Sequence, residues 1–233
     1  MTDSMEAVST TREGSYFMYV AIALVAVLMI SNTVATKLIA IGPLVLTGAI
    51  FLFPFSYIFG DILTEVYGYR ASRKIIWSGF VALAFMSLMY WIVGMLPPAV
   101  FWMNQDAYSA ILGVVPRIVL GSMLGYFAGE FCNSYVLSRM KIWTGGKHLW
   151  ARTIGSTVVG EGVDTVVFVL VAFAGLVPGS VLLSLMVSAY FVKVGIEVLL
   201  TPVTYKVVRF LKRAEGVDTF DHGVNYNPFA VRS

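Results

Sequence analysis

The feature that most restricts the fold is a series of long apolar segments with very few charges. The first of them, residues 16–36, contains no charged side chain over 21 residues. That length is enough for an α-helix to cross the hydrocarbon core of a bilayer, and it is too long for the apolar part of a typical signal peptide. Only 12% of all residues are charged, about half the fraction usual in soluble proteins. We therefore predict an all-α, polytopic integral membrane protein.

Gly-Pro, Pro-Pro and Pro-Gly breaks and basic loops divide the apolar sequence into six predicted transmembrane helices. They cover residues 16–36, 44–67, 75–96, 118–137, 153–177 and 180–208. We expect residues 99–115 to form an exposed loop or an interfacial segment. The predicted organisation is an N-terminal cytoplasmic segment (1–15), a six-helix transmembrane transporter domain (16–208) and a C-terminal cytoplasmic tail (209–233).

The placement of basic residues indicates the orientation of the bundle. With both termini inside, 13 of the 16 Lys and Arg residues fall on the cytoplasmic side. The other three are Lys37 and Arg117, near the outer surface, and Lys193, within a span. Cytoplasmic loops of membrane proteins carry an excess of Lys and Arg. This pattern predicts that both termini are cytoplasmic.

Four ionisable residues fall deep inside the predicted spans. Glu130 lies on the fourth span, Glu161 and Asp164 on the fifth, and Lys193 on the sixth. With a rise of about 1.5 Å per residue, all four occupy one layer slightly inward of the bilayer midplane. A charge at such depth costs at least about 2.5–3.5 kcal/mol and usually has a function. We interpret the layer as a solute site, the alternative being a charge cluster that only fixes helix packing.

The spacing of these charges suggests how they pair. Glu161 and Asp164 share a helix face, and Lys193 is their natural counter-charge, with Asp164 as the expected partner. Asp61 and Glu65 form a second acidic pair near the inner surface, where they either serve the solute path or pair with nearby basic residues. The other candidates are Asn133, Phe127 and Phe131 for substrate binding, and Glu197, Asn32 and Tyr57 for a secondary or gating role.

Gly121, Gly125 and Gly129 recur every four residues and form a small-residue face on the fourth span. Faces of this kind let two membrane helices approach closely. The face serves either a contact inside the monomer or a homodimer, and the sequence leaves both open.

Several classes of protein are excluded or disfavoured. A single cysteine, Cys132, excludes an intramolecular disulfide and a cysteine-based metal cluster. The chain has no H-E-x-x-H, G-x-S-x-G or Gly-rich phosphate-loop motif, and a net charge of +3 does not suggest nucleic-acid binding. We predict a carrier for a small polar solute, without enzymatic activity, metal or cofactor. A membrane-embedded enzyme that depends on its carboxylates, a channel, or a subunit with an energising partner are the alternatives.

Polar and aromatic residues recur at fixed spacings in three longer strings. These are Ser31-Asn32-x-x-Ala35-x-Lys37, Phe53-Pro54-x-x-Tyr57-Ile58-x-x-Asp61-Ile62-x-Thr64-Glu65-x-Tyr67-Gly68 and Gly155-Ser156-x-x-x-Gly160-Glu161-x-x-Asp164-Thr165, followed by Lys193-x-x-x-Glu197 and Pro202. Together they resemble the queuosine precursor transporter family, also called the vitamin uptake transporter family. The second string is the most specific, and the likeness extends from about residue 31 to residue 221.

The resemblance implies a multi-pass importer in the bacterial inner membrane. Its expected substrate is a deazapurine base: cyano- or aminomethyl-deazaguanine, or queuine. Another small polar heterocycle or vitamin is the alternative. A carboxylate can accept both N–H donors on the pairing edge of a deazaguanine. We predict Glu161 or Glu130 at that edge and Lys193 or Asn133 at the carbonyl, with the Asp164–Lys193 pair as an orienter or coupling switch.

Overall fold

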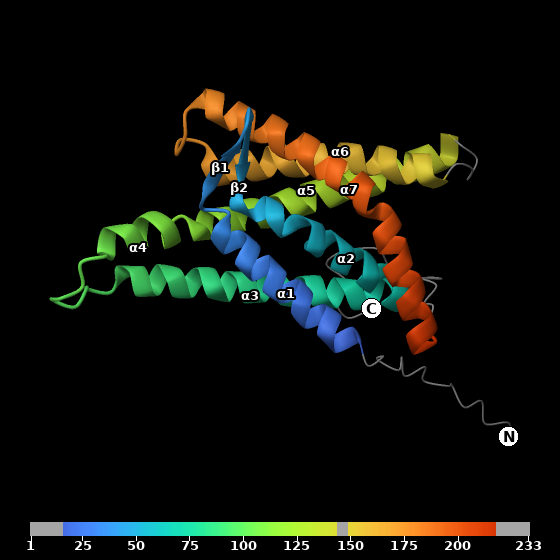
Figure 1. Ribbon diagram of the computed structural model, residues 1–233, viewed down its shortest axis with the longest axis horizontal. Coiled ribbons are helices and arrows are strands. Elements are labelled where there is room, and N and C mark those ends of the chain that lie inside the picture. The colour runs from blue at the N-terminus through green and yellow to red at the C-terminus, as the bar shows by residue number, and fades with distance from the viewer. Residues whose placement is uncertain (1–15, 144–148, 218–233) are drawn as a thin grey trace, which may run out of the picture.

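The protein is built mostly from helices that run along one axis (Figure 1). The computed structural model describes residues 16–143 and 149–217. Within these ranges the helices are α1 (Phe17–Val34), α2 (Phe53–Tyr67), α3 (Tyr69–Met95), α4 (Gln105–Leu112), α5 (Val115–Trp143), α6 (Leu149–Phe173) and α7 (Gly179–Glu215). Four stretches of the described chain are long and apolar enough to cross a membrane: Phe17–Val34, Arg70–Met95, Gln105–Gly129 and Gly179–Glu215.

The ends of the helices sort to two ends of the bundle. In Figure 1 the start of α1, the junction of α2 and α3, and the end of α7 lie at one end, while α4 and a β-hairpin lie toward the other. The first turns of α3 carry Arg70, Arg73 and Lys74, and the last turn of α7 carries Lys212 and Arg213. Basic residues far apart in the sequence therefore gather at the same end of the bundle.

The prediction of a second span starting at Leu44 is wrong. Leu38–Ile41 (β1) and Leu44–Thr47 (β2) form an antiparallel hairpin in which Ile41 lies opposite Leu44. Gly42, with φ of 58°, and Pro43 form the two-residue turn. A glycine at positive φ in the first position of such a turn favours a hairpin over a helix. The apolar run that hydropathy assigned to one helix is therefore divided between a hairpin and α2.

A short 3₁₀ helix, η1 (Gly48–Phe51), connects the hairpin to α2. Gly48 packs directly against the end of α1, because a Cβ at this position would lie 2.5 Å from the carbonyl oxygen of Val34. Pro54 occupies the first turn of α2, where the missing N–H of proline costs no hydrogen bond. In β2, the Val45 N–H donates to the hydroxyl of Ser188 on α7 at 3.3 Å. Irregular backbone is thus held against the helix bundle.

Residues 99–115, expected as a loop or interfacial segment, include α4, which has no buried residue. The side chain of Gln105 donates to the carbonyl of Gly94 at 3.1 Å and ties the start of α4 to the end of α3. Because no residue of α4 is buried, this helix adds little to the core. It lies beside the end of α3 (Figure 1).

Apolar side chains pack into three clusters along the bundle. One cluster, which we term the basic-end cluster, joins α1, α2 and α7 through Val20, Leu24, Ile62, Leu63, Val66, Tyr67, Val208 and Leu211. A second joins the end of α1 to α5, α6 and α7, and a third joins α3 to α5. Many large apolar side chains outside these clusters are exposed, as is usual for helices that face lipid.

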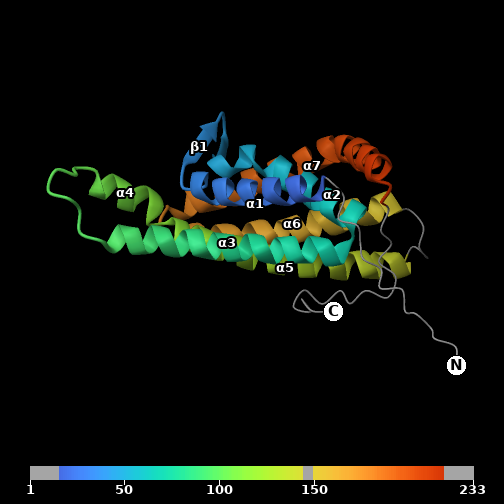
Figure 2. The ribbon, with the colours of Figure 1, turned by 90° about the horizontal axis from the view of Figure 1, so that it is seen from below.

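α7 takes part in two of these clusters because it bends. Leu185, near its start, packs with α5 and α6, whereas Val208 and Leu211 pack with α1 and α2. Pro202 lies between them inside the helix. A proline there removes one backbone hydrogen bond and kinks the helix. The change of direction is visible in α7 in Figures 1 and 2.

Candidate functional site

The buried ammonium of Lys193 on α7 is the centre of the candidate site. Its Nζ lies 2.6 Å from Asp164 Oδ2 and 3.3 Å from Glu161 Oε2, both on α6. The side chains of Lys193 and Glu161 are only 12% and 7% exposed. The expected pairing of Lys193 with Asp164 is therefore confirmed, and Glu161 joins the same cluster.

The local sequence of α6 explains why both carboxylates reach one lysine. Glu161 and Asp164 are separated by three residues, which places them on neighbouring positions of one helix face. Gly162, between them, leaves room for α7: a Cβ there would lie 3.5 Å from the ring of Tyr190. The hydroxyl of Tyr190 donates to the carbonyl of Val158 at 3.2 Å. These contacts hold α7 beside the carboxylate-bearing face of α6.

A second helix, α5, holds Asp164 through the glycine seam, which we define as Gly121, Gly125 and Gly129. A Cβ at Gly125 would lie 2.7 Å from Asp164 Oδ1, and one at Gly129 would lie 2.8 Å from both Asp164 Cβ and the carbonyl oxygen of Gly160. Gly121 approaches Phe168 and Ala172 of α6 in the same way. Of the two roles left open by the sequence, the seam serves a contact inside the monomer.

Arg117 at the start of α5 stabilises the far end of the same helix pair. Its Nε donates to the carbonyl of Val171 at 2.6 Å, and a terminal guanidinium nitrogen donates to the carbonyl of Ala174. The last carbonyls of a helix lack partners within the helix and carry partial negative charge, so a cation here is favourable. The outer position expected for Arg117 thus corresponds to a cap on α6.

Three other predicted site residues, Phe127, Asn32 and Glu197, have described side chains. Phe127 packs against Trp77, Phe80 and Tyr126, with ring centroids 5.5–5.9 Å apart. It lies on the face of α5 turned away from the glycine seam, so the structure does not bring it to Lys193. Asn32 is buried on α1, where its Nδ2 donates to the carbonyl of Leu28 at 2.9 Å.

Glu197 is half-buried and lies one turn beyond Lys193 on α7. The remaining candidates have side chains outside the described part of the structure: Tyr57, Asp61, Glu65, Glu130, Phe131 and Asn133. The backbone of Glu130 follows Gly129, which lies against Asp164. The membership of Glu130 in the cluster stays a prediction.

Two residues of the site were not singled out from the sequence. The ring of Phe53, at the start of α2, lies 4.6 Å from Lys193 Nζ and forms a cation–π contact. Thr165, one turn after Glu161, is 1% exposed. Both belong to strings that carried the family resemblance. Their spacing alone gave no reason to choose them. Phe53 reaches the site because the hairpin and η1 precede α2, so that α2 begins at this residue.

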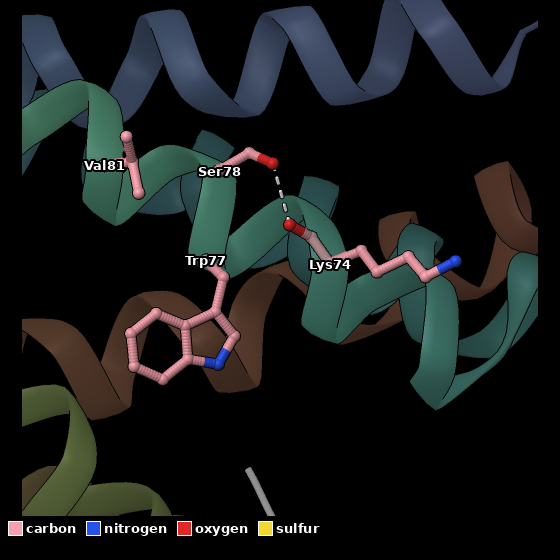
Figure 3. Close-up of a pocket in the computed structure, with 4 residues that line it drawn as sticks. All are labelled: Lys74, Trp77, Ser78 and Val81. Carbon is pink, nitrogen blue, oxygen red and sulfur yellow. Dashed lines mark hydrogen bonds between the residues drawn. The ribbon is translucent and has the colours of Figure 1, made fainter. Parts of the chain in front are cut away.

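A separate hollow of about 500 Å³ lies on α3 and is lined by Lys74, Trp77, Ser78 and Val81 (Figure 3). The Ser78 hydroxyl donates to the Lys74 carbonyl at 2.9 Å. Lys74, Ser78 and Val81 are exposed, so the hollow is open to the exterior of the bundle. None of these four lining residues is acidic, and the hollow does not include the Lys193 cluster.

The cluster is suited to binding a polar molecule by hydrogen bonds. A buried lysine offers N–H donors, and two carboxylates offer more acceptor positions than one lysine can occupy. Among the described residues, no group of three or more His, Cys, Asp or Glu side chains is arranged to hold a metal ion. The described side chains of the cluster thus present both hydrogen-bond donors and acceptors.

Comparisons with known proteins identify the family of the chain. The family described as "Putative vitamin uptake transporter" matches residues 47–207, which is more than half of the chain. A Bacillus subtilis (strain 168) protein named "Probable queuosine precursor transporter" is 33% identical over 156 residues, covering 66% of this chain and 68% of the relative. An Escherichia coli (strain K12) protein named "Queuosine precursor transporter" is 24% identical over 127 residues, covering 54% and 55%.

No solved structure matches the chain. The family match begins at the last residue of β2 and spans the start of α2, the glycine seam and the Lys193 cluster. The matched region therefore contains every described residue of the site. This chain belongs to the vitamin uptake transporter family and is a multi-pass membrane transporter.

Proposed function

We propose that the protein imports queuosine precursors, namely cyano- or aminomethyl-deazaguanine or queuine, across the bacterial inner membrane. The names of the two relatives support this substrate class. The proposed arrangement has six membrane-crossing helices in one domain, residues 16–208, with residues 1–15 and 209–233 in the cytoplasm. The gathering of basic residues at the end of the bundle where α7 ends supports the orientation.

The observation that carries the proposal is the state of Glu161. The residue is 6% exposed, and its Oε2 has the 3.3 Å ion-pair contact with Lys193 but no hydrogen bond within the described structure. A buried carboxylate with unused acceptor capacity is costly unless a ligand completes it. The two adjacent N–H groups of a deazaguanine pairing edge match such a carboxylate in bidentate geometry.

In the proposed complex, Glu161 accepts the ring N–H and the exocyclic amine, while Lys193 donates to the ring carbonyl. The three groups lie side by side on the heterocycle, as Glu161 and Lys193 do in the protein. Phe53 limits the space beside the ammonium. The site thus recognises the same edge of the base that forms base pairs.

Uptake of labelled aminomethyl-deazaguanine into bacteria unable to synthesise it tests this function. Cells with the protein should accumulate label, and Glu161→Gln should lower uptake by about 10- to 100-fold, because a charged bidentate acceptor is lost. Asp106→Asn, an exposed carboxylate on α4, is the matched control and should transport normally. Accumulation of riboflavin or guanine in place of the deazaguanine would exclude the proposed substrate. Normal uptake by Glu161→Gln would exclude the proposed contact.

A further inference from the structure

The two carboxylates beside Lys193 are held in different ways. Asp164 has the shorter contact, 2.6 Å against 3.3 Å for Glu161. It is also enclosed by α5, because Gly125 and Gly129 approach its side chain so closely that even a Cβ on either would collide with it. Movement of Asp164 toward α5 is therefore blocked. This constraint on Asp164 comes from the backbone of α5.

Glu161 is not held by the glycine seam, although its side chain is less exposed, 7% against 21% for Asp164. It has one more methylene than Asp164, and no glycine of the seam lies against it. Its Oε2 has only the longer contact with the ammonium among the described residues. A modest change of its side-chain torsions would exchange the ammonium for another donor. Of the two carboxylates, Glu161 has the longer contact with the ammonium, so it can turn to another donor while the hydrogen bond from Lys193 to Asp164 is kept.

Thr165 stands out among the threonines of the described helices. Thr33, Thr201 and Thr204 each donate their hydroxyl to the carbonyl four residues earlier, at 2.7–3.2 Å. This is the usual way for a threonine hydroxyl to be satisfied in a membrane helix. Thr165 is 1% exposed, and its Oγ1 has no hydrogen-bond partner in the described structure. A buried hydroxyl in this state can accept a hydrogen bond from a ligand without giving up a contact inside the protein.

Thr165 also lies in the right place to act with Glu161. The two residues are four positions apart on α6, so their side chains occupy the same helix face in adjacent turns. An exocyclic amine has two hydrogens. A carboxylate that binds a deazaguanine edge uses the ring N–H and one amine hydrogen, which leaves the second amine hydrogen for a neighbouring acceptor.

We propose that Thr165 is a specificity-determining residue that accepts the second hydrogen of the exocyclic amine of the solute, while Glu161 takes the first. This rests on the proposed function and names its discriminating contact. The ligand class is a planar heterocycle with a ring N–H next to a primary exocyclic amine. Solutes without that amine leave the Thr165 hydroxyl unsatisfied and bind more weakly.

The test compares the uptake kinetics of two solutes: aminomethyl-deazaguanine and the same compound without its exocyclic amine. Thr165→Val removes the hydroxyl at nearly constant shape and should raise the apparent KM for the amine-bearing solute on the order of tenfold. The KM of Thr165→Val for the analogue should stay within about twofold of the wild-type value, because the analogue has no amine hydrogen to donate to Thr165. Thr165→Ser should retain the wild-type preference between the two solutes.

Thr33→Val is the matched control, since that hydroxyl is satisfied within α1, and it should change neither KM. If Thr165→Val does not reach the membrane, Thr165→Ala is used in the same comparison. An unchanged KM for both solutes, or an equal rise for both, overturns the role of Thr165 and leaves the proposed function standing. Failure of the wild-type protein to take up either solute overturns the proposed function and this inference together.

Discussion

The glycine seam and the basic-end cluster bring helices together in opposite ways. At the seam, α5 and α6 approach until backbone meets side chain, with Gly125 and Gly129 against Asp164. In the basic-end cluster, α1, α2 and α7 are separated by large apolar side chains such as Leu63 and Leu211. Close backbone contact leaves no room for adjustment, whereas interlocking side chains can repack. The protein is therefore least adaptable where it holds its charges.

The largest loss of stability should come from removing the charge of Lys193, which pairs with the carboxylate held at the glycine seam. Lys193→Met would leave Glu161 and Asp164 buried without their cation, and loss of one partner from a buried ion pair costs about 3–5 kcal/mol. We expect a much lower thermal midpoint in detergent and little protein in the membrane. Lys206→Met, an exposed lysine of the same helix, should leave the midpoint nearly unchanged. A stable Lys193→Met protein would show that the cluster is not needed for folding.

A smaller effect should follow from adding a single methyl group to the seam. Gly129→Ala would place a Cβ 2.8 Å from the carbonyl oxygen of Gly160, and backbone cannot yield as a flexible side chain would. Overpacking of this kind costs about 1–3 kcal/mol. The control is Gly195→Ala on α7, where nothing lies within 4 Å of the added atom. Thermal unfolding of both variants measures the difference, and equal midpoints would show that α5 and α6 can separate freely.

The smallest effect should occur in the basic-end cluster. Leu63 is completely buried there, yet Leu63→Met conserves volume and should cost less than about 1.5 kcal/mol. Transport should continue at a rate close to that of the wild-type protein, because Leu63 lies on α2 and the Lys193 cluster lies on α6 and α7. A loss of stability as large as that of Gly129→Ala would mean that both regions are equally intolerant, and the contrast between them would fail.

The helical content and the pairing at the site were accessible from sequence because they depend on local spacing. Hydropathy is a property of neighbouring residues, and it located the long helices, although α3 begins at Tyr69 rather than at 75 and α7 ends at Glu215 rather than at 208. The i, i+3 relation of Glu161 and Asp164 predicted a shared face, and the matching depth of Lys193 predicted the ion pair. Hydropathy failed at residues 44–52, because an apolar run reads the same whether its backbone is a strand, a 3₁₀ turn or a helix.

The rotation of each helix about its axis could not be predicted. Phe127 was placed in the site by its proximity to Glu130 along the sequence, but it faces the rings of Trp77 and Phe80. Phe53 was quoted only as part of a motif, and it reaches Lys193 because η1 and the hairpin set where α2 begins. Both outcomes depend on contacts between segments that are distant in sequence.

By itself, the sequence determined that this chain belongs in a bilayer, since an exterior with so few charges cannot face water. It also placed two carboxylates and a lysine within long, mostly apolar helices. Only the tertiary structure decided that Asp164 lies against the glycines of α5 while Glu161 has the longer of the two contacts with Lys193. The physical reason is that a helix sequence sets which residues share a face, but the neighbour that the face meets is set by packing of the whole bundle.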